Sequence, residues 1–387
     1  MVRLTWGLIG GGEGSQIGLA HRIAANVDGL FQLSAGAMDL DANKGRIFAQ
    51  SLGIHPSRAY GDWKEMLDYE YKRTDKLNLV TVATINSTHF EITKAFLEAG
   101  FNILCEKPMT ITVEEAEEIV SICRSKGMIC AVNFCYSGFS LVRQMREMVL
   151  SGELGKIRVI NAEFAHGYHA NVQDQENPSI RWRYSPATAG VSSVLADAGA
   201  HALHLACFVT GQEVKSISAD FASIIPGREL EDDAMVNFRM DDGTVGRLWA
   251  SSVAIGRMHG LTLRVFGEKG GLFWQQEHPN QLYYTPMNGR TQIIERGSSD
   301  LSTAATRASR MGYGHSEGFP MALANIYRDL FEVIQVEKIN QLPTCEIDIY
   351  PKAEDGLRSM ASVYAAVESA KNNGKWIDAY PPMLKVI

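Results

Sequence analysis

The feature that most constrains the fold is an apolar segment near the N-terminus that runs directly into a cluster of glycines. Residues 4–18 read LTWGLIGGGEGSQIG, and apolar residues then recur every four positions at Leu19, Ile23 and Val27. This succession predicts a strand, a glycine turn and a helix. Because the N-terminus of a helix carries free backbone N–H groups, the arrangement is suited to binding the pyrophosphate of a dinucleotide.

The glycine spacing matches the dinucleotide-binding pattern Gly-x-Gly-x-x-Gly only in part. If the pattern begins at Gly10, its third position is Ser15, and if it begins at Gly12, its third position is Ile17. Glycine clusters also form ordinary tight turns, so the spacing alone leaves both interpretations open. The dinucleotide interpretation predicts that the cofactor is bound by Gly10, Gly12, Gly14, Ser15, Gln16 and Ile17.

The segments that follow support the dinucleotide interpretation. Apolar runs at residues 31–38, 77–84 and 101–106 alternate with helix-like segments. Strands that alternate with helices form parallel sheets with crossover helices. We therefore expect an N-terminal Rossmann dinucleotide-binding domain over residues 1–130.

An acidic residue, Asp39, ends the second apolar run. A carboxylate at this place binds the adenosine ribose hydroxyls of NAD and repels the 2′-phosphate of NADP, so we expect NAD, with NADP less favoured. The alternative role for Asp39 is to cap the next helix, although Asp41 is the better candidate for that cap. Lys44 and Arg46 follow closely enough to offset the repulsion in principle.

The remaining residues, 131–387, predict a C-terminal α+β domain, since a chain of 387 residues is too long for one ordinary core. One helical segment is expected near residues 193–210. The strand-like segments predict a large, mostly antiparallel open sheet and cover 156–166, 214–224, 234–254 and 261–274. The C-terminal helix, 354–374, is free to pack back on the first domain.

The uncovered face of this sheet is expected to form a subunit interface. A large exposed apolar face must be hidden, and packing two such faces together gives a closed, symmetric assembly. We therefore predict a homodimer or homotetramer. The apolar residues expected at the interface include Val245, Leu248, Leu263, Val265 and Phe273.

Composition excludes several other classes of function. The formal net charge of −7 and the lack of a basic stripe give no reason to expect nucleic acid or an anionic membrane as a partner. The chain has no apolar run near 18 residues and no signal peptide, so a cytoplasmic location is expected. The six cysteines form no Cys-x-x-Cys pair, and no metal site is expected.

Two polar segments follow strands of the predicted parallel sheet. Thr84, Asn86 and His89 come after the third apolar run, and Glu106-Lys107-Pro108 comes after the fourth. The carboxyl ends of such strands form the ligand crevice of an open α/β sheet, so these residues are candidates for cofactor binding. Taken alone, Glu106-Lys107-Pro108 also fits a solvated charged turn, and His89 fits a helix cap or a packing residue.

A second group of candidates lies in the predicted helix of the second domain. Asp197 and His201 are four residues apart, so an α-helix places them on the same face. An acid that orients an imidazole gives a general base for removing a hydroxyl proton. The alternatives are a surface pair, or a buried histidine whose nitrogens are hydrogen-bonded.

The combined motifs resemble the Gfo/Idh/MocA family of oxidoreductases. The glycine loop, Thr-x-Asn-x-x-His, Glu-Lys-Pro and Asp-x-Gly-x-His occur in the family's order, over essentially the whole chain. The resemblance implies that Lys107 bridges the nicotinamide ribose and a substrate hydroxyl, that Asp197 holds substrate and histidine, and that His201 is the general base. It also implies that Glu106 and Asn86 line the nicotinamide ribose.

The family resemblance implies an NAD-dependent dehydrogenase that oxidises a secondary hydroxyl of a cyclic polyol or sugar to a ketone or lactone. Neutral hydrogen-bonding groups in the second domain suit such a substrate, and the candidates for contact with it are His169, Trp182, Asp197, His201 and His315. Two alternatives stay open. One is a glycoside-cleaving enzyme that recycles its NAD, and the other is a non-catalytic, NAD-sensing regulator.

Overall fold

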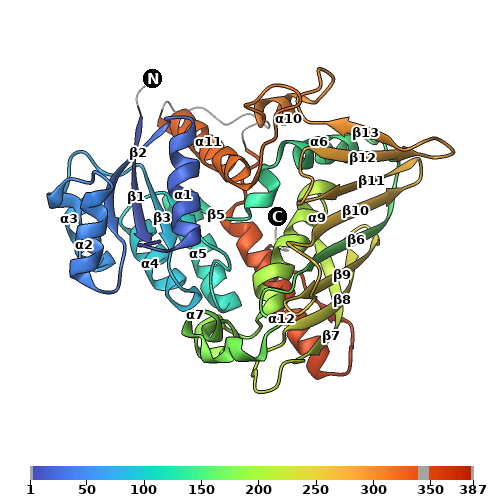
Figure 1. The fold of residues 1–387 in the computed structure, drawn as a ribbon, viewed down its shortest axis with the longest axis horizontal. Coiled ribbons are helices and arrows are strands. Elements are labelled where there is room, and N and C mark those ends of the chain that lie inside the picture. The colour runs from blue at the N-terminus through green and yellow to red at the C-terminus, as the bar shows by residue number, and fades with distance from the viewer. Residues whose placement is uncertain (1–2, 339–347, 385–387) are drawn as a thin grey trace. The chain divides into compact units, whose positions relative to one another are not determined.

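A computed structural model describes residues 3–338 and 348–384, which divide into two compact units (Figure 1). Unit 1 spans Met1–Thr110, Glu114–Gly138 and Phe319–Gly356, and unit 2 spans Ile111–Val113, Phe139–Gly318 and Leu357–Ile387. The division at Gly138 lies near the boundary expected at residue 130. The return of Phe319–Gly356 to unit 1 differs from the simple two-part division expected from the sequence.

The described strands of unit 1 form a five-stranded parallel sheet in the order β2-β1-β3-β4-β5. The order reverses between β1 and β3, which is where open α/β sheets bind ligands. The strands are β1 (Leu4–Gly10), β2 (Phe31–Ala37), β3 (Leu79–Ala83), β4 (Ile103–Cys105) and β5 (Cys130–Val132). The helices are α1 (Gln16–Val27), α2 (Ala42–Ser51), α3 (Trp63–Glu70), α4 (Asn86–Glu98), α5 (Val113–Lys126) and α11 (Phe319–Lys338).

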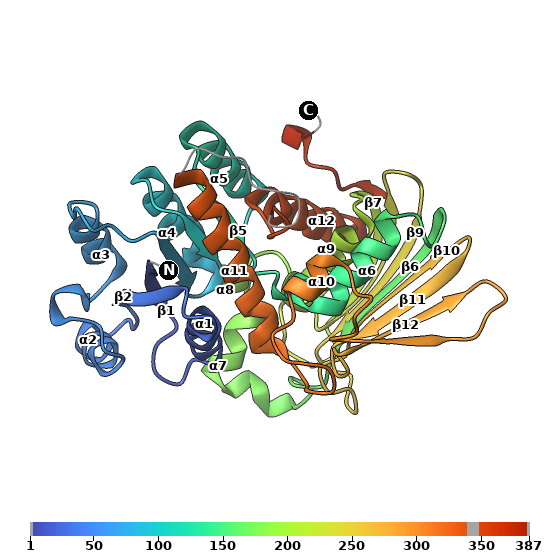
Figure 2. The same ribbon diagram turned by 90° about the horizontal axis from the view of Figure 1, so that it is seen from above.

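Helix α11 completes the core of unit 1, although it comes from the C-terminal part of the chain. It packs beside α1 (Figures 1 and 2). The ring of Tyr327 on α11 meets Trp6, His21 and Phe31 edge-on, with centroid distances of 5.7, 5.8 and 5.5 Å. All four side chains are buried. The N-terminal strand and helix therefore depend on a helix more than 300 residues away for their packing.

The described strands of unit 2 form a nine-stranded sheet in the order β13-β12-β11-β10-β6-β9-β8-β7-β14. Only the β6–β9 pair is parallel, which confirms the mostly antiparallel sheet. The strands are β6 (Ile157–Ala165), β7 (Val214–Ala222), β8 (Asp233–Met240), β9 (Val245–Ser251), β10 (Leu261–Gly267), β11 (Gly270–Gln275), β12 (Gln281–Pro286), β13 (Gln292–Glu295) and β14 (Ile377–Asp378).

Helices cover one face of this sheet, as Figure 2 shows. The helices of unit 2 in the described residues are α6 (Ser140–Leu150), α7 (Pro178–Arg181), α8 (Pro186–Ala189), α9 (Ala200–Thr210), α10 (Thr303–Arg307) and most of α12 (Ala353–Lys371). Helix α9 packs on β6 and β10, and α6 packs on α9.

The apolar residues expected at the subunit interface prove to come from both faces of the sheet. Leu248, Leu263 and Val265 are at most 1% exposed and belong to the helix-covered core, so assigning them to an interface was wrong. Val245 and Phe273 are partly exposed. Other outward-facing residues include Met235, Trp249, Phe266, Tyr283 and Ile293.

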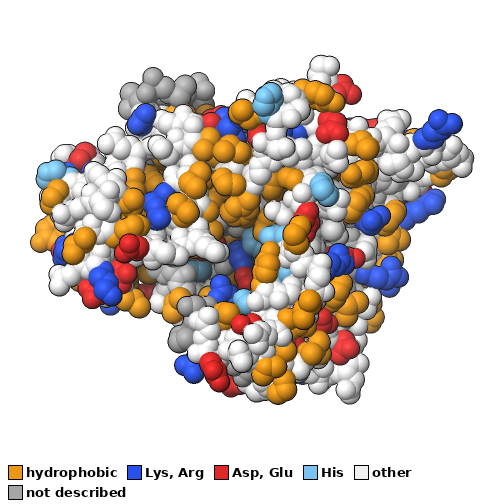
Figure 3. All heavy atoms as spheres, viewed as in Figure 1, with side chains coloured by type: hydrophobic (Ala, Val, Ile, Leu, Met, Phe, Trp, Pro, Cys, Tyr) orange, Lys and Arg blue, Asp and Glu red, His pale blue; other side chains and the backbone are white. Residues whose placement is uncertain are grey.

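No helix in the described ranges is long and apolar enough to cross a membrane. On the face shown in Figure 3, acidic and basic side chains are interspersed among hydrophobic ones.

Candidate active site

The glycine loop after β1 is packed so closely that side chains are excluded. Gly10, Gly11 and Gly14 have φ values of +75°, +64° and +78°, which residues with a side chain rarely adopt. A Cβ on Gly10 would lie 2.4 Å from the carbonyl oxygen of Ala83, and one on Gly12 would lie 2.3 Å from that of Met38. The loop therefore passes directly over the ends of the neighbouring strands.

The N-terminus of α1 has the features expected of a pyrophosphate site. Ser15 is the N-cap, and its hydroxyl accepts a hydrogen bond from the backbone N–H of Gly18 at 3.1 Å. A Cβ on Gly18 would lie 2.1 Å from the carbonyl oxygen of Gly11, so Gly18 provides the close helix packing usually given by the third glycine of the pattern. Gln16 and Ile17 begin the helix, where backbone N–H groups have no partner within it.

Asp39 and Asp41 have separate roles. Asp41 caps α2, accepting hydrogen bonds from the N–H groups of the next helical residues at 3.0 and 3.1 Å. Asp39 is exposed, and its Oδ2 lies 3.7 Å from the point that a Cβ on Gly12 would occupy. Arg46 is bound to Glu65 at 2.6 Å and to a backbone carbonyl. The carboxylate beside the glycine loop is thus Asp39, and Arg46 is held elsewhere.

The segment after β3 begins α4 and contains a buried histidine. Asn86 is the first residue of α4, and Thr84 accepts a hydrogen bond from Thr88 at 2.7 Å. His89 is 1% exposed, and its ring nitrogens lie 2.7 Å from the carbonyl oxygen of Pro108 and 3.1 Å from that of Thr84. Burial lowers the pKa of His89. The ring therefore joins two turns, and contact between His89 and the cofactor stays a prediction.

Glu106 is a buried carboxylate with several hydrogen-bond donors. Its Oε1 accepts from Asn133 at 2.5 Å and lies 2.8 Å from His21 Nε2, and its Oε2 accepts from the backbone N–H of Lys107 at 3.3 Å. Burial alone raises the pKa of a carboxyl group, but the interactions with His21 and Asn133 and the charge of Lys107 hold the pKa of Glu106 below its usual value. Lys107 itself is half-buried, and the Lys107–Pro108 peptide bond is cis.

In unit 2, Asp197 lies in a π-helical turn, η5 (Leu195–Gly199), and His201 lies in α9, which continues it. The sequence predicts a regular α-helix here, so the π turn is a difference, and such turns are frequent at functional sites. Asp197 is half-buried, and His201 is 7% exposed. The two residues share one continuous helical segment, as expected.

A buried carboxylate that sequence reasoning missed anchors the start of this segment. Oε1 of Glu231 accepts hydrogen bonds from the hydroxyl of Ser192 at 2.6 Å and from the backbone N–H groups of Ser193 and Leu195 at 2.9 and 3.1 Å. Burial raises the pKa of Glu231 above its usual value. Glu231 therefore fixes the backbone just before Asp197.

Arg183 connects Asp197 with an aromatic side chain. Arg183 Nε lies 3.9 Å from Asp197 Oδ2, and the guanidinium group lies over the ring of Trp182 at 4.5 Å. The structure thus brings Trp182 and Asp197 together through Arg183. Trp182 is half-buried in the short helix η4 (Trp182–Tyr184).

His169 belongs to an adjoining hydrogen-bonded group. Its Nδ1 lies 3.0 Å from the hydroxyl of Tyr184, which lies 2.7 Å from Ser252 Oγ. Burial and the positive charges of Arg183 and Arg228 lower the pKa of His169, which favours a neutral ring. Burial also raises the pKa of Tyr184 to about 12. The group therefore offers neutral donors and acceptors.

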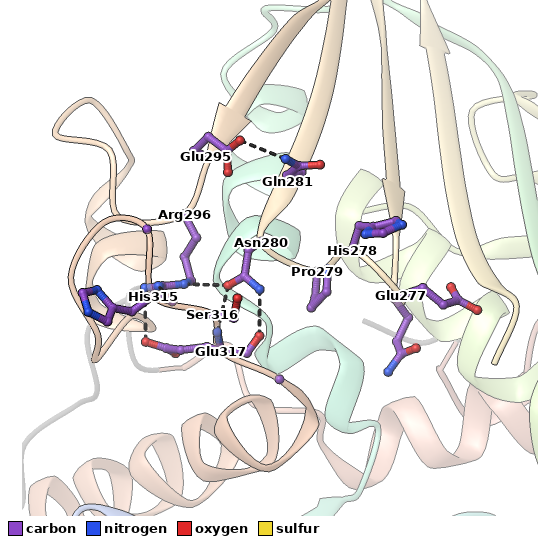
Figure 4. A pocket seen from close by; sticks show the side chains of 13 residues that line it. Glu277, His278, Pro279, Asn280, Gln281, Glu295, Arg296, His315, Ser316 and Glu317 are labelled. Carbon is purple, nitrogen blue, oxygen red and sulfur yellow. Dashed lines mark hydrogen bonds and ion pairs between the residues drawn. The ribbon is translucent and has the colours of Figure 1, made fainter. Parts of the chain in front are cut away.

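His315 lies with a different set of residues. It lines a cavity of about 570 Å³ in unit 2 whose lining includes none of the other substrate-binding candidates. Figure 4 shows Arg296, Asn280 and Glu317 pointing toward one another, with the ring of His315 pointing away from them. Arg296 Nη1 lies 3.2 Å from Glu317 Oε1, and Arg296 Nε donates to Asn280 at 2.7 Å. The buried Arg296–Glu317 pair and the half-buried Asn280 hold the loop on which His315 is exposed.

Comparison with known proteins identifies the family. Residues 4–134 match the model described as an oxidoreductase family with an NAD-binding Rossmann fold, and residues 142–273 match the model of the GFO/IDH/MocA C-terminal domain. The uncharacterised oxidoreductase YfiI of Bacillus subtilis (strain 168) is 35% identical over 97% of this chain and 96% of the relative. The chain belongs to the Gfo/Idh/MocA family of oxidoreductases. Unit 1 accordingly contains an NAD-binding Rossmann domain, and the close glycine loop and capped α1 fit that cofactor.

Solved structures of this family resemble the chain over its whole length. An inositol dehydrogenase homologue from Azotobacter vinelandii, in complex with NAD⁺, is 37% identical with a TM-score of 0.92, and the match covers 97% of each chain. A structure of that homologue with NADH and myo-inositol gives 36% identity, a TM-score of 0.90 and the same coverage. The levoglucosan dehydrogenase of Pseudarthrobacter phenanthrenivorans is 26% identical over 98% of both chains. The chain is therefore an oxidoreductase of a family whose dehydrogenases act on sugars and polyols.

Proposed function

We propose that this protein is an NAD-dependent dehydrogenase that oxidises a secondary hydroxyl of a cyclic polyol or sugar to a ketone or lactone. The observation that carries the proposal is the helical segment with Asp197 and His201, in a chain whose other unit binds NAD. A carboxylate and an imidazole in one segment, fixed by Glu231, can orient a hydroxyl and accept its proton.

The proposed reaction divides into a proton transfer and a hydride transfer. His201 accepts the hydroxyl proton as general base, while Asp197 orients the substrate and the imidazole. Bound NAD⁺ supplies a hydride acceptor for the hydrogen on the carbinol carbon. We assign stabilisation of the developing alkoxide charge to Lys107, because Glu106-Lys107-Pro108 matches the family motif.

Neutral hydrogen-bonding groups near Asp197 favour a polyol or sugar over a charged substrate. His169 and Tyr184 are held neutral by burial, and Trp182 offers a half-buried aromatic surface. The homologue solved with myo-inositol and the levoglucosan dehydrogenase point to the same class. We keep His315 as a weaker candidate, because it lines a different cavity.

A screen of NADH fluorescence over inositols, aldoses and glycosides tests the proposal. Net formation of NADH together with a ketone or lactone product is the expected result. Release of a free aglycone without net NADH indicates glycoside cleavage with recycled NAD. Binding of NADH without turnover of any of these compounds indicates a regulator and contradicts the proposal.

We also propose a homodimer or homotetramer formed through the outer face of the unit 2 sheet. The outward side chains are aromatic and cationic: Arg264 lies over Phe273 at 3.9 Å, and Phe273 contacts Tyr283 at a centroid distance of 5.7 Å. Met235 and Ile293 are 49% and 52% exposed. Aromatic side chains, methionine and arginine are enriched in protein interfaces.

A further inference from the structure

We propose that His21 and Tyr327 are positioning residues, which hold Glu106 ionised beside Lys107 through a chain of hydrogen bonds that runs in one direction. The inference rests on the proposed NAD-dependent function and adds residues to its cofactor site. Glu106 is the carboxylate that receives the last hydrogen bond of the chain.

Five buried side chains of unit 1 form this chain. Trp6 Nε1 donates to Thr81 Oγ1 at 2.9 Å, and Thr81 Oγ1 lies 3.0 Å from the hydroxyl of Tyr327. The same hydroxyl lies 2.9 Å from His21 Nδ1, and His21 Nε2 lies 2.8 Å from Glu106 Oε1. None of the five is more than 8% exposed, so water does not compete for these bonds.

The chemistry of its two ends sets the direction of the chain. The indole N–H of Trp6 can only donate, and an ionised Glu106 can only accept. Between them, Thr81 therefore donates to Tyr327, Tyr327 donates to Nδ1 of His21, and Nε2–H of His21 donates to Glu106. Each hydroxyl then accepts one hydrogen bond and donates one, and His21 accepts at Nδ1 and donates from Nε2.

The reverse arrangement leaves a buried proton without an acceptor. If a neutral Glu106 instead donated its proton to Nε2 of His21, Nδ1–H would donate to Tyr327, and Tyr327 would donate to Thr81. Among the described residues, the side-chain partners of the Thr81 hydroxyl are Trp6 and Tyr327, so its own proton would face two donors. A buried donor without an acceptor costs about 1–3 kcal/mol. The packing therefore favours the tautomer that donates to Glu106.

The consequence for Glu106 concerns its charge. A buried carboxyl group becomes neutral at higher pH than an exposed one unless hydrogen bonds stabilise its ionised form. His21 and Asn133 both donate to Oε1 of Glu106. The other oxygen, Oε2, accepts a hydrogen bond from the backbone N–H of Lys107. In its ionised form Glu106 can accept a hydrogen bond from a ribose hydroxyl or attract the ammonium group of Lys107.

Several other titratable groups face Glu106, and burial favours the neutral form of four of them. Burial raises the pKa of Tyr327, Cys105 and Cys135, and burial lowers the pKa of His89. Lys107 is the neighbour whose positive charge acts on Glu106. A change in cofactor affinity between pH 3.5 and 7 that depends on Tyr327 can therefore be assigned to Glu106.

The first experiment removes one hydroxyl group from the chain. Tyr327→Phe keeps the ring contacts with Trp6, His21 and Phe31 but removes the hydrogen bond to Nδ1 of His21, which makes Nε2–H a weaker donor to Glu106. Calorimetric titration with NAD⁺ from pH 3.5 to 7 measures the midpoint at which acid weakens binding. We expect Tyr327→Phe to raise that midpoint by about half a pH unit or more, because the carboxylate loses a donor.

Tyr60→Phe is the matched control, since Tyr60 donates a buried hydrogen bond to Glu70 in the same unit at 2.8 Å. It should lower the melting temperature without moving the midpoint. If Tyr327→Phe lowers the melting temperature and leaves the midpoint unchanged, the hydrogen-bond chain is only structural and the inference is wrong. Absence of NAD⁺ binding by the wild-type protein at every pH would instead overturn the proposed function.

A second pair of variants tests His21 directly. In His21→Gln the amide N–H can still donate to Glu106, so its midpoint should stay close to that of the wild type. His21→Leu removes the donor and should raise the midpoint further than Tyr327→Phe does. Equal midpoints for the Gln and Leu variants would show that donation from His21 does not control the charge of Glu106. In the unliganded protein, ¹⁵N NMR of the histidine rings should show His21 protonated on Nε2 alone.

Discussion

Gly18 lies against Gly11 so closely that a Cβ on Gly18 would be 2.1 Å from the Gly11 carbonyl oxygen. The first turn of α1 is thereby drawn onto the glycine loop, with its N–H groups at the end of β1. The departure from the Gly-x-Gly-x-x-Gly spacing is therefore compensated by a glycine three residues beyond Ser15.

We predict that Gly18→Ala weakens NAD⁺ binding at least tenfold, because the added methyl group must push α1 away from the loop. Gly312→Ala is the control, since a Cβ on that glycine of unit 2 would meet no atom within 4 Å. Calorimetric titration measures both affinities. Unchanged NAD⁺ affinity in Gly18→Ala would show that the cofactor does not need this close approach.

Asp39 should set the choice between NAD and NADP. We expect the wild-type enzyme to prefer NAD by about tenfold or more in kcat/KM, because a partly desolvated like-charge contact with a 2′-phosphate costs several kcal/mol. Asp39→Ala should narrow or invert that ratio. Asp41→Ala should instead cost about 1 kcal/mol of stability through loss of the α2 cap, with the ratio unchanged. Equal use of NADP by the wild type would rule out this role for Asp39.

His201→Ala should lower turnover at least a hundredfold, about 3 kcal/mol, because general-base catalysis typically contributes about 10²–10⁴-fold. NAD⁺ affinity should stay nearly intact, and measuring it in the same variant serves as the control. Steady-state kinetics with the best compound from the NADH screen gives the result. Turnover within tenfold of the wild type would remove His201 from the mechanism.

Glu231 should make the protein less stable as the pH rises. Its pKa is raised in the folded state, so the folded protein retains a proton that the unfolded chain releases. The free energy of unfolding therefore falls as the pH rises from the pKa of Glu231 in the unfolded chain to its higher pKa in the folded protein. Glu231→Gln keeps an accepting oxygen without a titrating proton. The melting temperature of the wild type, measured from pH 4 to 8, should therefore fall relative to that of Glu231→Gln. Parallel curves for the two proteins would contradict this assignment.

Light scattering at micromolar protein should give the mass of a dimer or tetramer. Phe273→Arg places a charge on the outer face of the sheet and should reduce the mass toward that of a monomer. Ile47→Arg, at a 70% exposed position on α2, should leave it unchanged. A monomeric mass for the wild type would contradict the proposed assembly.

Local patterns in the sequence predicted the parts of the site that depend on near neighbours. The glycine loop, Asp39 at the end of β2 and Asp41 as the α2 cap all follow from residues close together in the chain. Asn133 offered a usable signal as well, because it directly follows β5 and so lies at the same sheet edge as Glu106. The π turn around Asp197 had no signal in the spacing of apolar residues.

Contacts between distant segments could not be predicted in this way. Tyr327 contacts His21, which is 306 residues away in the sequence, and nothing in the composition of helix α11 predicts that contact. The alternation of apolar and polar residues along β9 and β10 assigns the side chains to two faces of the sheet. It does not predict which of the two faces the helices cover. Leu248 and Val265 were therefore assigned to the wrong face, while Trp249 on the outer face was overlooked.

The dependence of Trp6 and Phe31 on Tyr327 has a consequence for how the chain is made. A ribosome has synthesised most of the protein before α11 emerges, and until then the NAD-binding unit lacks a helix that covers its first strand and helix. The N-terminal part cannot mature on its own, as N-terminal domains usually do during synthesis. Nascent chains must therefore keep this apolar surface shielded, and a product truncated before Phe319 leaves it permanently exposed.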